Sequence, residues 1–275
     1  MGVFVVWPII SSFELSMYRW NGIAPVRDYI GFDNWTRLWN DSIFWQAFRN
    51  NMTVVVISIL VQMPIAMILA IMLERASHIF TFKFFRTVYF FPMLMSSVAI
   101  GILFKYIYDP SFGVVNTFLE GAGLDDWTRS WLGERDVVLY AVIAVICWQF
   151  IPFYMILFQA ALSSISEDLR DAARIDGANE TQYYLRIAIP LVRGTIRTAM
   201  ILSLIGSLKY FDLIWVMTGG GPNNASELMA TYMYKRAFPS FEMGYGSTIA
   251  AALFIIVMVI AMIAFFVSRR FETEV

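Results

Sequence analysis

Long apolar stretches separated by polar segments dominate the pattern of the chain. Five of them reach the ~20 residues that a helix needs to cross a bilayer. They cover about 53–73, 87–107, 138–158, 196–216 and 248–268. A sixth, 3–18, has no charged segment before it and no small-residue cleavage site after it. We interpret it as a first span that lacks its natural beginning, not as a signal peptide. The pattern predicts an all-α, polytopic membrane protein with six transmembrane helices in one domain, 1–275.

Basic residues in the connecting segments predict the orientation in the membrane. One set of segments comprises 74–86, 159–195 and 269–275. The other comprises 19–52, 108–137 and 217–247. The first set holds ten basic residues, counting Arg197 at the edge of the next span, and the longer second set holds eight. Because cytoplasmic loops carry the excess of Lys and Arg, we expect the first set and both termini on the cytoplasmic side.

The composition excludes several classes of protein. Hydrophobic residues make up 59% of the chain and charged residues 15%, against about 25% charged residues in an ordinary soluble protein. The net charge of −1 gives no nucleic-acid footprint. A single cysteine, Cys147, and a single histidine, His78, allow no internal disulfide and no thiolate or imidazole metal cluster. We therefore expect lipid around much of the chain and no resident metal.

Polar residues inside the apolar spans are the candidates for a binding site. Ser203, Ser207 and Tyr210 have the spacing of one helical face, and Gln149 and Phe153 are four residues apart. Hydroxyl, amide and aromatic groups on facing helices suit a neutral polyol. The same residue types also join helices to each other, so a packing role stays open. Lys209 and Asp212 are three apart and are able to pair or to face the interior.

The segment 159–195 predicts two short helices outside the spans. Residues 164–167 (Ser-Ile-Ser-Glu) fit a capping box that starts the first helix. Small and apolar positions then form one face: Leu169, Ala172 and Ala173. Gly177 fits the left-handed residue that closes this helix.

Asn179 and Gln182 resemble the cap of the second helix, and Pro190 marks the return to the membrane. A small exposed face on the first helix suits docking in the groove of a partner, and a helix resting on lipid is the alternative. The sequence Gly-Gly-Gly-Pro at 219–222 ends the fifth span abruptly. It lacks the Lys-Ser/Thr of a phosphate-binding loop, so we reject that role.

Three motifs in this loop carry a family resemblance. Asp-Ala-Ala at 171–173, Gly-Ala at 177–178 and Ile-Ala-Ile-Pro at 187–190 resemble, with matching spacing, the signature of membrane permease subunits of binding-protein-dependent ABC importers. Asp171 replaces the usual Glu, and Ile189 replaces the usual Leu. The resemblance implies the type I ABC importer permease fold, with a cytoplasmic coupling helix between spans four and five. It implies contacts to an ATPase through Asp171, Ala172, Ala173, Gly177, Ala178, Ile187 and Pro190.

A second resemblance narrows the family. Residues 211–222 look like the carbohydrate-uptake branch, in the subunit type of the larger maltose and glycerol-phosphate permeases, and 152–155 and 244–247 agree with it. In that branch the sugar contacts come from segments just before the Pro152 and Gly219 motifs. In this chain these segments hold Gln149, Phe150, Phe153, Ser203, Ser207 and Tyr210.

The resemblance also implies an assembly in a prokaryotic inner membrane. A second homologous permease would complete the pathway, two cytoplasmic ATPase subunits would hold ATP and Mg, and an external solute-binding protein would deliver the carbohydrate. This chain has no Walker motif, so we expect no cofactor and no catalytic residue on it. A self-contained secondary transporter is the alternative, although no internal repeat supports it. The sequence does not identify the sugar.

Overall fold

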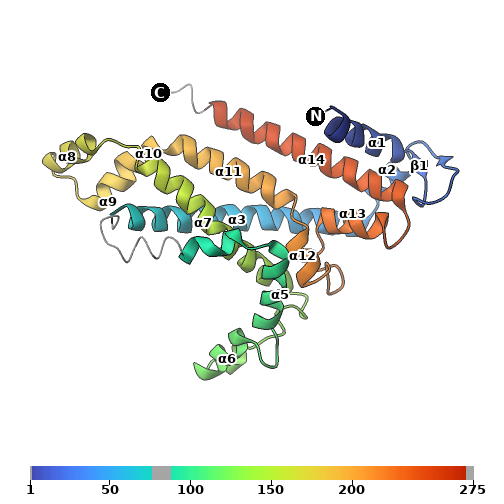
Figure 1. Ribbon diagram of the computed structural model, residues 1–275, viewed down its shortest axis with the longest axis horizontal. Coiled ribbons are helices and arrows are strands. Elements are labelled where there is room, and N and C mark those ends of the chain that lie inside the picture. Colours follow the sequence, from blue (N-terminus) through green and yellow to red (C-terminus); the bar gives the residue numbers. More distant parts are fainter. Residues whose placement is uncertain (1, 76–87, 271–275) are drawn as a thin grey trace. The chain divides into compact units, whose positions relative to one another are not determined.

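The computed structural model describes residues 2–75 and 88–270 (Figure 1). His78, and Lys83 and Arg86 of the predicted cytoplasmic set, lie outside the described residues. The chain divides into two compact units, which are described separately. Unit 1 comprises Met1–Val54, Ser97–Val142 and Ser207–Val275, and unit 2 comprises Val55–Ser96 and Ile143–Gly206.

The described residues are mainly helical, which confirms the predicted all-α class. The first half contains η1 (Gly2–Val6), α1 (Trp7–Leu15), β1 (Tyr18–Arg19), β2 (Asp28–Tyr29), α2 (Asp33–Trp39), α3 (Ser42–Arg75), a helix at Val88–Leu94, α5 (Ser97–Ile107), α6 (Val114–Gly121) and η2 (Asp125–Trp127). The second half contains α7 (Val138–Leu162), α8 (Glu167–Ile175), α9 (Glu180–Tyr183), η3 (Tyr184–Ala188), α10 (Ile189–Leu191), α11 (Arg193–Leu208), α12 (Asp212–Met217), α13 (Met229–Ala237) and α14 (Met243–Arg270). Strands β1 and β2 form one short antiparallel hairpin.

Three of the predicted spans are continuous helices. α3, α7 and α14 are each long and apolar enough to cross a bilayer, and each contains a predicted span. α3 and α7 continue through Pro64 and Pro152, each of which removes one backbone donor from its helix. The predicted first span corresponds to a shorter apolar helix, Phe4–Leu15.

The third and fifth predicted spans are interrupted. Within the predicted third span, one helix ends at Leu94 and α5 begins at Ser97, so residues 95–96 break the helix. In the predicted fifth span, α11 ends at Leu208 and α12 begins at Asp212, so a continuous helix over 196–216 is wrong. α11 instead follows Glu180–Leu191 at an angle of 68°. If each bent pair is one span, up to five spans lie within the described residues.

Unit 1 is held together around α14, which packs against α1, α2 and α13. Figure 1 shows α14 running beside α1. A Cβ at Gly246 would lie 2.6 Å from the Cβ of Ala237, so α13 and α14 approach through backbone that only glycine leaves free. In the same unit, α12 packs against α5. The glycines of the motif at 244–247 therefore serve close packing.

Candidate functional site

α8 begins later than its predicted capping box. The hydroxyl of Ser164 donates to the carbonyl of Ala161 at 2.7 Å and so extends the end of α7 instead of starting a new helix. Ser166 occupies the N-cap of α8 without a side-chain hydrogen bond. The first turn carries Glu167 and Asp168, whose charges favour a helix N-terminus. The predicted capping box is therefore wrong, but the predicted helix is present.

The end of α8 has the predicted glycine geometry. Gly177 has a φ of +82°, a conformation in which a side chain is strained. Its N–H donates to the carbonyl of Arg174 at 3.0 Å, and the N–H of Ala178 donates to the carbonyl of Ala173 at 2.9 Å. These bonds satisfy carbonyls that the helix end leaves without partners. The chain turns sharply here towards α9.

The predicted cap of α9 is confirmed. The N–H of Gln182 donates to Oδ1 of Asn179, and the N–H of Asn179 donates to Oε1 of Gln182, each at 2.9 Å. Pro190 is exposed in α10, and Ile187 is partly buried in η3. Of the predicted coupling residues, these two lie beyond the capped turn and Ala178 lies within it.

The exposed side of α8 differs from the predicted face by one residue. Ala173 is only 6% exposed, whereas Ala172 is exposed. Leu169 is 38% and Ile175 86% exposed, and with Ala172 they repeat every three residues. Asp171 is exposed and pairs with Arg174 at 3.4 Å. The exposed apolar face of α8 is therefore Leu169, Ala172 and Ile175, and Ala173 packs inward because one residue turns a helix by about 100°.

Arg170 ties α8 to two other helices in unit 2. Its guanidinium lies 3.3 Å from Glu74 near the end of α3 and 2.7 Å from Glu180 at the start of α9. The hydroxyl of Tyr184 also donates to Glu74, and Arg174 pairs with Glu180 at 3.0 Å. Burial works to lower the pKa of Arg170, but these acidic partners outweigh it and raise the pKa. We call these five residues the Arg170 cluster; the sequence pattern did not indicate it.

The candidate pathway residues fall in both units. Gln149 and Ser203 are buried, and Phe150 and Phe153 are partly buried, in unit 2. The hydroxyl of Ser203 donates to Oε1 of buried Gln62 on α3 at 3.3 Å, so it joins two helices.

Ser207 is buried and Tyr210 partly buried in unit 1. Because α11 ends at Leu208, Tyr210 does not share a helical face with the two serines, and that prediction is wrong. Lys209 and Asp212 are both exposed, and among the described residues they do not pair with each other.

Buried Asn51 explains why α11 stops. Its side-chain amide donates to the carbonyls of Ser207 and Leu208 at 3.2 and 3.4 Å. Its Oδ1 accepts the N–H of Met229, the first residue of α13, at 2.9 Å. One side chain on α3 therefore satisfies the end of one helix and the start of another.

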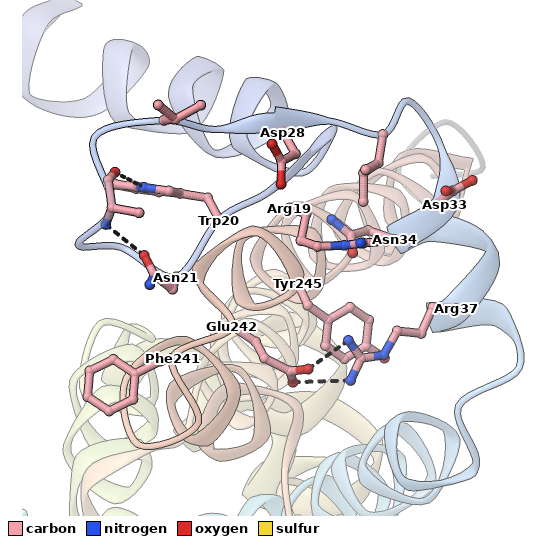
Figure 2. A pocket seen from close by; sticks show the side chains of 13 residues that line it. Arg19, Trp20, Asn21, Asp28, Asp33, Asn34, Arg37, Phe241, Glu242 and Tyr245 are labelled. Carbon is pink, nitrogen blue, oxygen red and sulfur yellow. Dashed lines mark hydrogen bonds and ion pairs between the residues drawn. The ribbon is translucent and has the colours of Figure 1, made fainter.

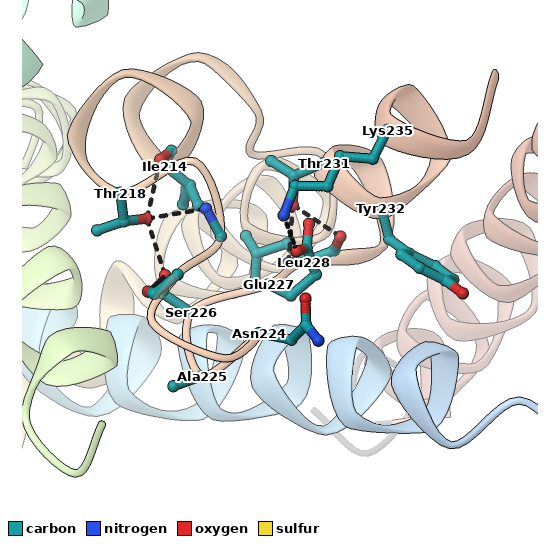
Figure 3. Close-up of polar contacts among 12 residues, drawn as sticks. Ile214, Thr218, Asn224, Ala225, Ser226, Glu227, Leu228, Thr231, Tyr232 and Lys235 are labelled. Atoms are coloured by element: carbon teal, nitrogen blue, oxygen red, sulfur yellow. Dashed lines mark hydrogen bonds and ion pairs between the residues drawn. The ribbon is translucent and has the colours of Figure 1, made fainter. Parts of the chain in front are cut away.

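The glycine-rich segment 218–228 is held by the same face of α3. Gln46 donates to the carbonyl of Asn224 at 2.9 Å, and Asn50 donates to the carbonyls of Ala225 and Glu227 at 3.0 and 2.9 Å. Figure 3 shows the internal contacts of the segment, where Ser226 donates to Thr218 at 2.8 Å. The predicted abrupt helix end is confirmed, since α12 stops at Met217.

Glu227 is buried under this segment. Lys235 pairs with its carboxylate, as Figure 3 shows. Gly220 has a φ of +84°, and a Cβ there would lie 2.6 Å from Cδ of Glu227. Gly219 also has a positive φ, but its nearest neighbour is 4.0 Å away. The two glycines therefore allow a tight backbone turn, and Gly220 lies directly over the buried carboxylate of Glu227.

Long apolar helices, with a short capped helix between two of them, are typical of a multi-pass membrane protein. Residues 62–275 match the family described as binding-protein-dependent transport system inner membrane component. The chain belongs to this family, so it is a multi-pass inner-membrane permease of an ABC importer and not an enzyme or a self-contained secondary transporter. The predicted type I permease fold is confirmed.

Known relatives cover nearly the whole chain. It is 36% identical over 260 residues to the probable ABC transporter permease protein YurN of Bacillus subtilis (strain 168), which covers 94% of this chain and 89% of the relative. It is 32% identical over 275 residues to the lactose transport system permease protein LacF of Rhizobium radiobacter, covering 98% and 90%. A chain of a bacterial alginate ABC transporter, solved in complex with an alginate pentasaccharide-bound periplasmic protein, superposes with a TM-score of 0.85 at 27% identity, covering 98% and 90%.

Proposed function

We propose that this permease imports a carbohydrate. Two of the relatives described above are named for lactose and alginate transport, and they match nearly the full length of the chain. The motif at 211–222 that suggested the carbohydrate branch forms the whole of α12 and the turn over Glu227. The sugar path would be lined by Gln149, Phe150, Phe153, Ser203, Ser207 and Tyr210.

The exposed face of α8 would be the docking site for an ATPase subunit. A side chain as apolar as Ile175 that is 86% exposed on a helix outside the spans calls for a partner. Leu169 and Ala172 extend the same face, and Gly177 fixes the turn that ends it. Asp171, Ala173, Ala178, Ile187 and Pro190 would support this docking segment without all touching the partner.

The working importer would contain further chains. A second homologous permease would complete the pathway, and two ATPase subunits would bind ATP and Mg, since this chain has no Walker motif. An external solute-binding protein would deliver the sugar, as the periplasmic protein of the alginate structure suggests. Residues 1–275 would form one transmembrane domain with both termini in the cytoplasm.

Sugar uptake by proteoliposomes tests this proposal. The complete importer should accumulate a sugar from a lactose, maltotriose and xylotriose panel only with ATP inside and the binding protein outside. Ile175→Asp should abolish uptake and release the ATPase from the purified complex, because a buried unpaired charge is costly at an interface. Ile23→Asp is the matched control, since Ile23 is 73% exposed in the first outer segment. Uptake that persists in the Ile175 variant would refute docking at α8.

A further inference from the structure

Unit 1 contains a polar cavity at the start of the membrane-spanning helix α14. It has a volume of about 420 Å³ and lies between the β1–β2 hairpin, α2 and the start of α14. Figure 2 shows side chains from these elements directed around it. The volume falls in the ~300–1,000 Å³ range of small-molecule sites. Its segments belong to the set that the charge pattern predicts to be external.

One side of the cavity is rigid. Both guanidinium nitrogens of Arg37 bond to the carboxylate of Glu242, at 2.9 and 3.1 Å, in the paired arrangement seen in Figure 2. The same guanidinium lies 3.9 Å from the centre of the Tyr245 ring. The hydroxyl of Tyr245 donates to Asp41, which in turn accepts the N–H of Ile43 at the start of α3. This wall is therefore formed before any ligand arrives.

Other charged groups around the cavity have no ion-pair partner. Arg19, Asp28 and Asp33 line it, and none of them forms a side-chain ion pair or hydrogen bond within the part of the chain that the structure describes. A guanidinium and two carboxylates, all on exposed side chains, thus line one cavity. Sugar hydroxyls both donate and accept hydrogen bonds, so they satisfy such a mixed set. A simple anion would meet two unpaired carboxylates and only one unpaired guanidinium.

Phe241 adds an aromatic surface at a cost in backbone energy. Its φ is +51°, which is a rare conformation for a bulky side chain. Its ring is 57% exposed and lines the cavity, so packing contributes little to holding it there. Backbone strain at such a position points to a functional role.

We propose that this cavity binds a neutral carbohydrate directly, with Phe241 against the sugar ring and Arg19, Asp28 and Asp33 on its hydroxyls. The site shares no residue with the six pathway residues and would hold sugar near the external face. It rests on the proposed carbohydrate specificity for its substrate class. A protein docking surface would cover about 800 Å² per partner, whereas this is a small concave pocket with unpaired polar groups.

Sugar binding to the purified complex in lipid nanodiscs, without the binding protein, tests the proposal. The probes are lactose, maltotriose and xylotriose, measured by saturation-transfer NMR and calorimetry. Phe241→Gly should weaken binding of at least one probe roughly threefold to tenfold, the loss expected for one aromatic contact. Its melting temperature should stay equal or rise, because glycine relieves the positive φ. Asp33→Asn should also weaken binding, and Phe238→Ala, at a 53% exposed ring outside the cavity, should not.

The outcomes separate the two proposals. If no probe binds in a Phe241-dependent way, the cavity proposal is wrong, whether or not uptake occurs. If a probe binds but none is transported, the proposed import function is wrong and the cavity stands. If the Phe241 variant binds sugar normally and loses only affinity for the binding protein, the cavity is a protein docking site. The proposal that the cavity binds sugar is then overturned.

Discussion

At the residue scale, glycines and amides determine where the helices of this permease stop. Gly177 closes α8 with a positive φ and no neighbouring atom within 4 Å of its Cβ position. Gly220 turns over the carboxylate of Glu227, and Asn51 satisfies the end of α11. The glycines adopt backbone conformations that larger side chains disfavour, and Asn51 hydrogen-bonds carbonyls that an apolar side chain would leave without a partner.

Gly220 and Gly219 allow a matched comparison. Both have positive φ, so alanine at either position should cost about 1 kcal/mol or more of unfolding free energy. Only Gly220→Ala adds overlap with Glu227, which costs a further 1–3 kcal/mol or so. We expect thermal denaturation of the detergent-solubilised complex to show the lower melting temperature for Gly220→Ala. Equal melting temperatures would mean that Glu227 moves aside freely.

Gly177 is expected to matter only through its backbone conformation. Gly177→Val should abolish uptake and substrate-stimulated ATP hydrolysis, because a β-branched residue disfavours a φ of +82° and the proposed docking helix α8 would lose its end. Gly177→Asn should retain most activity, since Asn tolerates that conformation. Stimulated ATPase activity measured in proteoliposomes checks this. Wild-type stimulation in the Val variant would contradict it.

At the element scale, the sequence predicts the features that depend on local pattern and misses those that depend on long-range contacts. Long apolar stretches predicted the spans in α3, α7 and α14. Residue types that favour turns and caps predicted the turn at Gly177 and the cap at Asn179. The break after Leu208 was missed because it depends on Asn51, more than 150 residues earlier. The Arg170 cluster was missed for the same reason, since Glu74 and Arg170 are 96 residues apart.

The Arg170 cluster should transmit movement of α8 to α3. Arg170→Met removes both ion pairs and should lower uptake roughly 5–150-fold while ATP hydrolysis continues, which is the range of a 1–3 kcal/mol coupling energy. Arg170→Lys should be intermediate, because it keeps the charge and loses the planar fork. Arg174→Met is the control, since Arg174 bonds Glu180 but not Glu74. The ratio of sugar transported to ATP hydrolysed is the measurement, and an unchanged ratio in Arg170→Met would exclude this role.

At the scale of the whole molecule, the chain is the permease subunit of an importer. Its family and the relatives that match nearly its full length establish this role. Of the six proposed pathway residues, Ser203 and Ser207 lie within α11, and Ser203 also bonds Gln62 on α3. Such a bond joins two helices whether or not the residue contacts sugar. A transport role for the pathway residues therefore needs a test that separates sugar contact from helix packing.

Tyr210 offers that test because it lies between α11 and α12 and outside either helix. Tyr210→Ala should raise the KM of sugar uptake and leave assembly with the ATPase intact, because α8, the proposed docking helix, is a separate element. Tyr210→Phe keeps the ring and removes the hydroxyl, so it shows which part of the side chain the sugar needs. Assembly is measured by copurification and uptake in proteoliposomes. Wild-type uptake kinetics in Tyr210→Ala would make Tyr210 a packing residue, and loss of assembly would make it a structural one.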